Sequence, residues 1–506
     1  MTQKKEWTKD ERYLPYTEWS ENYIIGLEEK VSNSPYRLNY HIQPNSGLLN
    51  DPNGFSFFNG KWQLFYQSYP FGPVHGLKSW HHLTSVDLIH WQDEGLALTP
   101  STDFDSHGVY SGSATPIDDK LFLFYTENVR DEKWQRYTYQ NGAFMDKDGE
   151  ITKINTPLIE QPEQYTDHFR DPMVFYYNQK LFAIIGAQDK SEKGKIALYK
   201  AKNNQPTVWL QNGELTFTKD ELGFMIECPN LVFIDEQPVL LFCPQGLDKR
   251  IEKYENIYPN MYIIGTDFNP ETGKINQTSH MQNLDDGFDV YATQAFNAPD
   301  GRVLSVGWIG LPDIEYPTDF DGWAHCLSLV RELSLTNGKL YQYPVMETKK
   351  LRLEEIETQL EGLVVAPSNN AYELELTVPA DETVSLTLYS DKEKSIGLTL
   401  NVDSTNGTIE LNREKSGQTF AEAFGNIRTS TVEKNQLVKL NIFADTSVVE
   451  IFVNNGEKVL TSRVFPAENQ HFIHANKVLT ATMWPLANAG TDFTTEKIAK
   501  TLVYSR

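Results

Sequence analysis

Five segments of the 506-residue sequence repeat one pattern, and this repeat constrains the fold more than any other feature. Each segment opens with a polar or acidic residue, runs as an apolar strand, turns at a short polar stretch and returns as a second apolar strand. The segments are NDPNGFSFFNGKWQLFYQS from Asn50, SGSATPIDDKLFLFYTE from Ser111, RDPMVFYYNQKLFAIIGA from Arg170, ECPNLVFIDEQPVLLFCPQG from Glu227 and DVYATQAFNAPDGRVLSVGW from Asp289. Their marker residues Asp51, Ser111, Asp171, Glu227 and Asp289 are 60, 60, 56 and 62 residues apart. This regularity indicates one structural unit used five times.

A unit of this length with several short strands is typical of a β-propeller blade, in which about four strands radiate from a central channel. We therefore predict a five-bladed β-propeller over residues 35–345. Equivalent positions of successive blades face the same axis. The five marker residues are expected to converge at one mouth of the channel.

The sequence outside the repeats predicts three further regions. Residues 1–34 are expected to form an N-terminal helical extension, with an amphipathic helix from Thr17 to Arg37. Residues 346–364 have helical spacing and predict a helical linker. Residues 365–506 contain many short segments that alternate apolar with polar residues, and this period of two predicts a β-sandwich. The predicted class is all-β.

Composition excludes several kinds of partner. The formal charge of -24 argues against nucleic acid, which is bound through clustered Lys and Arg. The N-terminus lacks the apolar core of a secretory signal, and no segment approaches the roughly 20 apolar residues that cross a bilayer. Three widely spaced cysteines predict neither disulfides nor a zinc site. We expect a cytoplasmic monomer or homodimer without membrane, metal or cofactor.

Carboxylates that converge at a channel mouth predict a particular chemistry. Mutual repulsion and partial desolvation raise the pKa of at least one acid, which stays protonated beside an ionised neighbour. One acid and one anion is the pair that glycosidic cleavage requires. In a retaining hydrolase the anion attacks the anomeric carbon and the acid protonates the leaving oxygen, with the two groups about 5 to 5.5 Å apart.

Four motifs in order resemble the signatures of glycoside hydrolase family 32, the invertase and fructanase family. They are NDPNG with Asp51, YSGS with Ser111, FRDP with Asp171 and ECPN with Glu227. The resemblance covers nearly the whole chain and implies a five-bladed propeller followed by a β-sandwich. It further implies a retaining hydrolase of terminal β-D-fructofuranosides that works through a covalent fructosyl-enzyme.

The resemblance also implies roles for individual residues. Asp51 would be the nucleophile, Glu227 the general acid and base, and Asp171 the group that holds fructose hydroxyls and stabilises the transition state. Cys228, beside the acid, would either tune Glu227 or serve packing. The positions expected to bind substrate are Asn50, Gln67, Trp80, Tyr110, Ser111, Arg170, Asp289, Tyr291 and Trp308.

The sequence leaves several substrates open. The segment GPVHGLKSWHH resembles the sucrose-6-phosphate hydrolase branch, and its His75, Lys78, His81 and His82 are a hypothetical anion site for a sugar phosphate. The main prediction is therefore hydrolysis of sucrose or sucrose 6-phosphate. Alternatives are an exo-hydrolase of short fructo-oligosaccharides such as kestose, an inverting arabinanase and a non-catalytic sugar-binding propeller.

Overall fold

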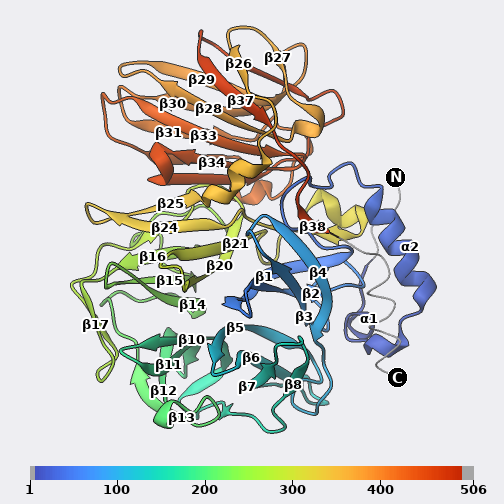
Figure 1. Ribbon diagram of the computed structural model, residues 1–506, viewed down its shortest axis with the longest axis vertical. Helices are drawn as coiled ribbons and strands as arrows, with labels where there is room; N and C mark the ends of the chain where they lie inside the picture. Colours follow the sequence, from blue (N-terminus) through green and yellow to red (C-terminus); the bar gives the residue numbers. More distant parts are fainter. Residues whose placement is uncertain (1–5, 493–506) are drawn as a thin grey trace.

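The N-terminal segment lies against one side of the molecule in the computed structural model, which describes residues 6–492 (Figure 1). It contains α1 (Lys9–Arg12), a short 3-10 turn (Tyr16–Glu18) and α2 (Glu21–Ser32). The side chain of Ser20 accepts a hydrogen bond from the backbone N–H of Tyr23, and this cap starts α2 four residues later than predicted. None of the helices within residues 6–492 is long and apolar enough to cross a membrane.

Five sheets of four or more strands follow along the chain. The first contains β1 (Gly47–Phe58), β2 (Lys61–Tyr69), β3 (Ser79–Ser85) and β4 (His90–Leu98), and is extended by β22 (Trp323–Ala324) and β38 (Gly490–Asp492). The second contains β5 (Val109–Ile117), β6 (Lys120–Arg130), β7 (Arg136–Met145), β8 (Ile151–Lys153) and β9 (Ile159–Glu160). The third contains β10 (Tyr165–Tyr177), β11 (Lys180–Asp189), β12 (Gly194–Ala201) and β13 (Trp209–Glu214).

The fourth sheet contains β14 (Met225–Ile234), β15 (Gln237–Gln245), β16 (Met261–Ile264) and β19 (Gln282–Asn283). The fifth contains β20 (Val290–Asn297), β21 (Val303–Ile309), β23 (Cys326–Leu327), β24 (Arg331–Thr336) and β25 (Lys339–Pro344). A separate hairpin joins β17 (Asp267–Asn269) to β18 (Lys274–Asn276). The first strands of the five sheets contact one another in the order β1, β5, β10, β14 and β20, and β20 contacts β1 again. These contacts place five equivalent strands around one axis.

Each of these five first strands carries a β-bulge at the same place. Pairing with the second strand is interrupted after Leu49, Val109, Arg170, Glu227 and Tyr291. The interruptions contain Asp51, Ser111, Asp171, Cys228 and Ala292, of which the last three have positive φ angles of 65°, 47° and 48°. A bulge redirects a side chain and often lies beside an active site. The repeat in the sequence is therefore a repeat of bulges.

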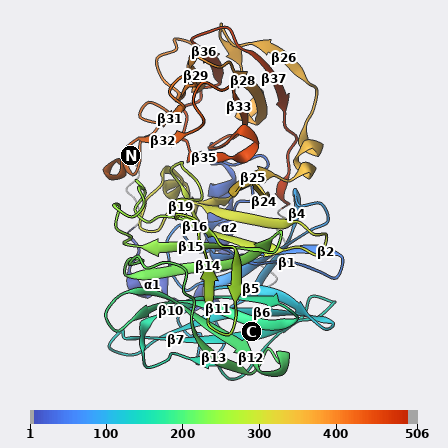
Figure 2. The same cartoon turned by 90° about the vertical axis from the view of Figure 1, so that its left-hand side faces the viewer.

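The C-terminal part of the chain forms two six-stranded sheets packed face to face, above the fifth sheet in the view of Figure 2. One sheet contains β26 (Ile356–Gln359), β37 (Thr480–Pro485), β28 (Tyr372–Val378), β33 (Val438–Asp445), β34 (Val448–Val453) and β35 (Lys458–Arg463). The other contains β27 (Val364–Val365), β36 (Phe472–Ala475), β29 (Thr383–Ser390), β30 (Leu398–Asp403), β31 (Thr408–Asn412) and β32 (Ile427–Thr431). The predicted all-β class and β-sandwich are confirmed.

The predicted helical linker over residues 346–364 is wrong. The segment starts with a 3-10 turn at Met346–Leu351, and its later part forms β26, which pairs with β37 of the sandwich. The buried side chains of Leu351 and Leu360 belong to two different hydrophobic clusters, so one continuous helical face would not bury both. Pairing with β37 has overridden the local helical pattern.

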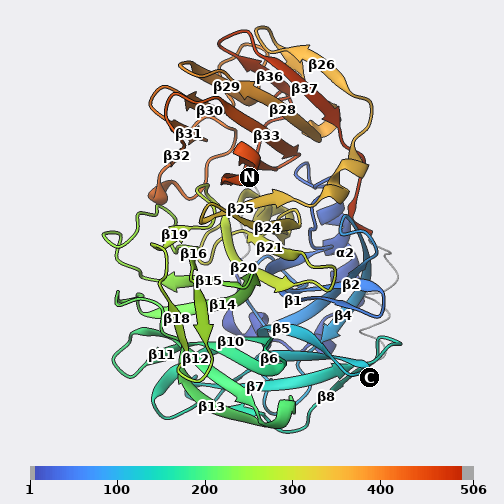
Figure 3. The ribbon, with the colours of Figure 1, turned by 60° about the vertical axis from the view of Figure 1, so that its left-hand side comes forward.

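The sandwich also ends earlier than predicted. Its last strand, β37, ends at Pro485 (Figure 3). The chain then returns to the first sheet, where β38 pairs with β4 in parallel (Figure 1). Residues 493–506, which the prediction placed in the sandwich, and residues 1–5 of the predicted extension lie outside the described residues.

Candidate active site

The first bulge presents Asp51 to the axis. Its carboxylate accepts a hydrogen bond from the Ser111 hydroxyl of the second sheet at 2.5 Å and one from the Asn50 amide at 3.1 Å. Asn50 Nδ2 also donates to Gln67 Oε1 at 2.5 Å. The side chains of Asn50 and Gln67 are buried, and Asp51 is half-buried. Neighbouring groups therefore fix the orientation of the Asp51 carboxylate.

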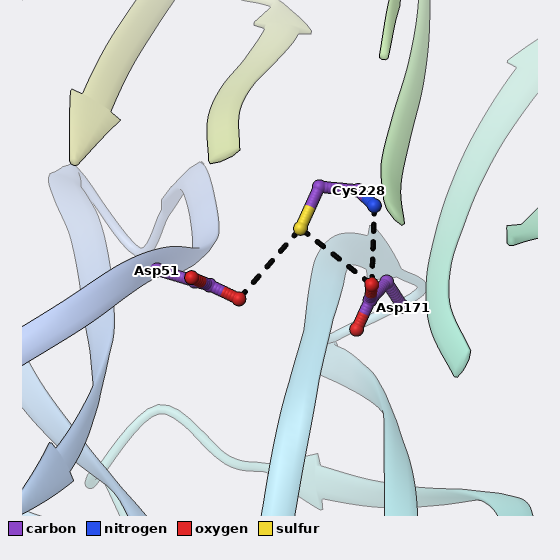
Figure 4. Close-up of side chains that lie close together, drawn as sticks. All are labelled: Asp51, Asp171 and Cys228. Carbon is purple, nitrogen blue, oxygen red and sulfur yellow. Dashed lines mark hydrogen bonds between the residues drawn. The ribbon is translucent and has the colours of Figure 1, made fainter. Parts of the chain in front are cut away.

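The third and fourth bulges bring Asp171 and Cys228 next to Asp51. The Sγ atom of Cys228 lies 3.6 Å from Oδ2 of Asp51 and 3.6 Å from Oδ2 of Asp171, so the thiol sits between the two carboxylates (Figure 4). The backbone N–H of Cys228 donates to Asp171 at 3.1 Å. Potential ligand atoms of these three residues lie within 4.8 Å of one another, although such clusters are common without a metal.

Glu227 lies one residue before the fourth bulge and has four hydrogen bonds. Arg170 donates to its Oε1 through Nε at 3.1 Å and Nη2 at 2.7 Å. The Tyr291 hydroxyl and the Gln245 amide donate to Oε2 at 2.7 and 2.8 Å. Two sheets besides its own supply Arg170 and Tyr291. This carboxylate is held on both oxygens.

Lys78 is buried beside these groups. Its Nζ donates to Asn50 Oδ1 at 2.9 Å and to Gln67 Oε1 at 2.7 Å. Burial lowers the pKa of Lys78 to about 8, against the opposing attraction of Asp51 and Glu227. Lys78 places a positive charge near the carboxylates but does not form an ion pair with Asp51.

The pKa values of the carboxyl groups are shifted in opposite directions, as the sequence predicted for converging acids. The group with the raised pKa, however, is Asp171 and not Glu227. Burial raises the pKa of Asp171 to about 7 against the attraction of Arg170, and the charges of Glu227 and Asp51 add to the rise. Burial alone also raises the pKa of Glu227, but the charge and hydrogen bonds of Arg170 and the Tyr291 bond reverse this and lower it. Near neutral pH, Asp171 is therefore the acid that favours the protonated form, while Glu227 favours the ionised form.

Asp289 is not brought to the site. Its carboxylate is fully buried at the junction with the sandwich, where it accepts bonds from Arg413 Nη1 at 2.8 Å, the Arg463 backbone N–H at 2.8 Å and the Tyr316 hydroxyl at 2.9 Å. The fifth bulge contains Ala292, three residues later. Asp289 was matched to the wrong position of the repeat.

The two predicted tryptophans are buried as well. Trp80 is 0% exposed, packs between the first and second sheets and donates to the Tyr110 carbonyl at 2.9 Å. Trp308 is 1% exposed, lies behind Tyr291 and donates to His325 at 2.8 Å. Both side chains support residues of the site from behind. Tyr110, by contrast, is half-buried at the rim.

His81 and His82, two of the four basic residues of GPVHGLKSWHH, have other partners than a shared anion site. His81 is buried and bonded to Asp93 at 2.6 Å, and His82 is buried and bonded to Gln63 at 2.8 Å. Both lie on β3, whereas Lys78 precedes this strand and donates to Asn50 and Gln67. The predicted cluster is wrong because these histidines have structural partners within the first sheet.

Comparison with protein families matches both halves of the chain. A model described as the glycosyl hydrolases family 32 N-terminal domain matches residues 41–344, and the family 32 C-terminal model matches residues 342–485. The chain belongs to glycoside hydrolase family 32. The predicted family is confirmed, and with it a propeller followed by a β-sandwich.

Similar members of the family share most of the chain. The sucrose-6-phosphate hydrolase of Streptococcus mutans is 52% identical over 460 residues, covering 91% of this chain and 95% of that protein. The solved sucrose-6-phosphate hydrolase of Lactobacillus gasseri has a TM-score of 0.93 and 45% identity, covering 96% of this chain and 100% of that one. A mutant Bombyx mori family 32 β-fructofuranosidase, solved in complex with sucrose, has a TM-score of 0.80 and 28% identity, covering 94% and 100%.

The family and its similar members make this chain a β-fructofuranosidase, a glycosidase that cleaves terminal β-D-fructofuranosides. The prediction of an enzyme is confirmed. These matches favour a hydrolase of the sucrose-cleaving kind over a fructo-oligosaccharide exo-hydrolase and over a non-catalytic sugar-binding propeller.

Two contacts of this family 32 site are missing from the sequence prediction. Gln245 is on β15, the return strand of the Glu227 hairpin, and the register of that hairpin would have placed it nearby. His168 is on β10, two residues before Arg170, and its Nδ1 lies 3.0 Å from Arg170 Nη1. The available signal for His168 was its position two residues before Arg170, since alternate residues of a strand tend to share a face.

Proposed function

We propose that the enzyme hydrolyses sucrose 6-phosphate to glucose 6-phosphate and fructose. The observation that carries this is the set of Asp51, Asp171 and Glu227 at neighbouring bulges. The chain is also similar over most of its length to family members named sucrose-6-phosphate hydrolases. Sucrose is the second substrate, supported by the sucrose complex of the Bombyx mori relative.

The proposed mechanism is a double displacement. A carboxylate oxygen of Asp51 attacks the anomeric carbon of fructose, and Glu227 protonates the glycosidic oxygen as that bond breaks. Glu227 then removes a proton from water, which displaces Asp51 and releases fructose. Asn50, Ser111 and the buried Lys78 hold the nucleophile and its neighbours in place.

The proton has to change places when substrate binds. In the free site Asp171 holds it, whereas catalysis requires it on Glu227. A fructose hydroxyl that donates to Asp171 stabilises the ionised form and lowers its pKa. Because the two acids are coupled, the proton then moves in favour of Glu227. Asp171 acts by holding fructose, and its hydrogen bond with fructose favours the protonated form of Glu227 that catalysis requires.

The remaining predictions belong to the same proposal. The five sheets are five blades of one propeller, a count supported by the closed ring of contacts from β1 to β20. The enzyme works as a monomer or homodimer, without metal or cofactor and without nucleic acid or membrane partners. It acts in the cytoplasm, since a charged sugar phosphate does not cross a bilayer unaided. Light scattering and cell fractionation test the assembly and the location.

A side-by-side steady-state assay of released fructose tests the substrate. Sucrose, sucrose 6-phosphate and kestose are compared at equal concentration with the purified enzyme. We expect kcat/KM to be highest for sucrose 6-phosphate. A preference below threefold over sucrose contradicts the phosphorylated substrate, and a higher value for kestose identifies an oligosaccharide hydrolase instead.

A further inference from the structure

A line of basic side chains leads outward from the general acid along β10. Arg170 donates to Glu227 through Nε and Nη2, and its Nη1 lies 3.0 Å from Nδ1 of His168. This contact brings the two side chains together although the pairing of β10 is irregular between Tyr165 and Phe169. Glu227 protonates the leaving group, so His168 stands on the side of the site from which the glucosyl unit departs.

The hairpin between β6 and β7 adds two arginines to this rim. Arg130 and Arg136 face each other across the hairpin. Arg136 is 12% exposed and donates from Nε to Asp167 at 3.1 Å. Arg130 donates from Nη1 to the Trp134 carbonyl at 3.1 Å, and its buried Nε has no hydrogen-bond partner among residues 6–492. The guanidinium of Arg130 is thus only partly satisfied.

Positive charge is crowded at this rim. Burial and the charges of Arg170 and Arg136 lower the pKa of His168 to about 4. Burial and Arg170 also lower the pKa of Arg136, with Tyr110 and Asp167 opposing. Such crowding is unexpected in a chain with a formal charge of -24. An anion is the ligand that relieves it.

His168 can donate a hydrogen bond to an anion bound at this rim. The Arg170 guanidinium has only donors, so Nδ1 of His168 accepts. The neutral ring therefore carries its hydrogen on Nε2 and offers this N–H to a ligand. Together with the guanidinium nitrogens of Arg136 other than Nε, which is bonded to Asp167, it supplies donors of the kind that phosphate oxygens accept.

The hairpin is held in place by the N-terminal segment. Trp134, at its tip, packs edge-on against Tyr13 with ring centroids 5.1 Å apart, and Lys9 Nζ lies 3.3 Å from the Trp134 ring centroid. The rim is therefore positioned before any ligand arrives, which reduces the entropy lost on binding.

We propose that Arg136 and His168, backed by Arg130, form the subsite for the phosphoryl group of the leaving glucosyl unit. This inference rests on the proposed function and names the residues that would give it selectivity. It replaces the cluster on GPVHGLKSWHH, whose histidines are bonded within the first sheet.

Steady-state kinetics of Arg136→Gln and His168→Gln test the subsite. Each substitution should lower kcat/KM for sucrose 6-phosphate by roughly 10- to 100-fold, the loss expected for a hydrogen bond to a charged group. The value for sucrose should change less than about threefold in Arg136→Gln on the same scale. His168→Gln is judged by the ratio of kcat/KM for the two sugars, because His168 also contacts Arg170, the partner of Glu227. Arg136→Lys keeps the charge and the Asp167 partner but loses the planar fork, so it should retain part of the selectivity. Arg250→Gln is the matched control, because Arg250 is a 90% exposed side chain that pairs with Asp248.

Binding of the product gives a measurement independent of turnover. Calorimetry with glucose 6-phosphate and glucose should show tighter binding of the phosphorylated sugar to the wild type and to Arg250→Gln. Arg136→Gln and His168→Gln should lose that difference. Equal Kd values for both sugars in the wild type overturn the subsite.

The two kinds of failure are distinguishable. If the wild type prefers sucrose 6-phosphate and both variants keep that preference, the proposed function stands and the subsite lies elsewhere. If the wild type cleaves neither sugar, the proposed function falls, and the calorimetric comparison alone decides whether this rim binds a sugar phosphate.

Discussion

The protein buries two clusters of carboxylates that share a chemistry and differ in how they are balanced. In the active site, Asp51 and Asp171 have no ion pair within residues 6–492, and Glu227 is paired with Arg170. At the junction of propeller and sandwich, His41 bridges Asp445 and Glu450 at 2.9 and 3.0 Å. The active site leaves acids uncompensated, whereas the junction pairs them.

Further pairs complete the junction. Arg331 Nη2 lies 2.6 Å from Glu450, and Arg413 Nη1 lies 2.8 Å from Asp289. These groups come from both domains and are almost fully buried. A buried acid with a complete set of partners is a structural group, while one that shares a proton with its neighbours is available for chemistry. Pairing, more than burial or position in the repeat, separates Asp51 and Asp171 from the junction acids, whereas Glu227 is paired with Arg170 and still belongs to the active site.

The strongest test exchanges one acid of each cluster for its amide. Asp51→Asn should lower kcat by roughly four orders of magnitude, since the proposed nucleophile is lost, and leave the Tm nearly unchanged. Asp289→Asn should leave kcat within about twofold and lower the Tm, because Arg413 loses its buried counter-charge. Steady-state assays and thermal unfolding of both variants give the comparison. Loss of activity in Asp289→Asn with an intact Tm would show that Asp289 contributes to catalysis.

The second test removes the proton donor. Glu227→Gln should lower kcat for sucrose by roughly 10²- to 10⁴-fold, the usual contribution of a general acid. A fructoside with a good leaving group needs little protonation, so its first step should recover. Burst kinetics on such a substrate measure the first step separately. A uniform loss on good and poor leaving groups would contradict the assignment of Glu227 as the acid.

The third test breaks the junction. Arg331→Met leaves Glu450 buried without its guanidinium partner, and the free energy of unfolding should fall by about 3 to 5 kcal/mol. Urea unfolding of the intact chain measures the loss. Arg302→Met, at a partly exposed ion pair on the propeller surface, is the control and should change the stability by about 1 kcal/mol or less. An equal effect of both substitutions would mean that the junction network adds no stability.

The fourth test uses pH, since the two clusters respond with opposite sign. The pKa of Asp171 is about 7 in the folded protein and about 4 when unfolded. The folded state therefore binds more protons between these values, and this contribution to stability is lost as pH rises from 4 to 7. The pKa values of Asp445 and Glu450 are lowered by partners such as His41 and Arg331, although burial opposes this. Their contribution is present above the unfolded pKa and is lost as pH falls.

Asp171→Asn isolates the active-site part of this dependence. Relative to the wild type, the variant should gain stability between pH 5 and pH 8 by at most about 3 kcal/mol, because it no longer has a buried carboxyl to ionise. Thermal unfolding at the two pH values gives the difference. A gap between wild type and variant that is the same at pH 5 and pH 8 would contradict the raised pKa of Asp171.

The sequence predicted the part of the fold that repeats. Spacing and turn signals identified the propeller-type repeat, and alternation identified the sandwich, because both depend on local patterns. The prediction from sequence failed where a contact between residues far apart in the chain determines the local structure. The pairing of β26 with β37 replaced a helix, and contacts with the sandwich assigned Asp289 to the junction. Tertiary partners of this kind are not encoded in the spacing of residues.

The positions of candidate site residues were likewise predicted correctly where a local motif marks them and wrongly where distant contacts decide their place. Asp51, Asp171 and Glu227 converge because each lies at or beside a bulge that its motif marks. Trp80 carries no such mark, and its burial depends on the packing of two sheets. The bulge is the unit that repeats, so alignment by the bulge would have selected Ala292 in place of Asp289.

The smallest expected effect concerns Cys228, whose thiol lies between the two site aspartates. Burial raises its pKa well above the ordinary value, with Asp171 and Asp51 adding to the rise, so the group is a neutral thiol and a weak donor to both. Cys228→Ala removes these two contacts and keeps the backbone bond to Asp171 at 3.1 Å. We expect kcat/KM to fall by roughly threefold to tenfold, the size of one weak hydrogen bond, and Cys228→Ser to restore part of it. If the thiol only fills space, Ala and Ser would have equal effects. If it tunes the carboxylates, the pH profile of kcat/KM would move in Ala and return in Ser, because only the hydroxyl replaces the lost donor.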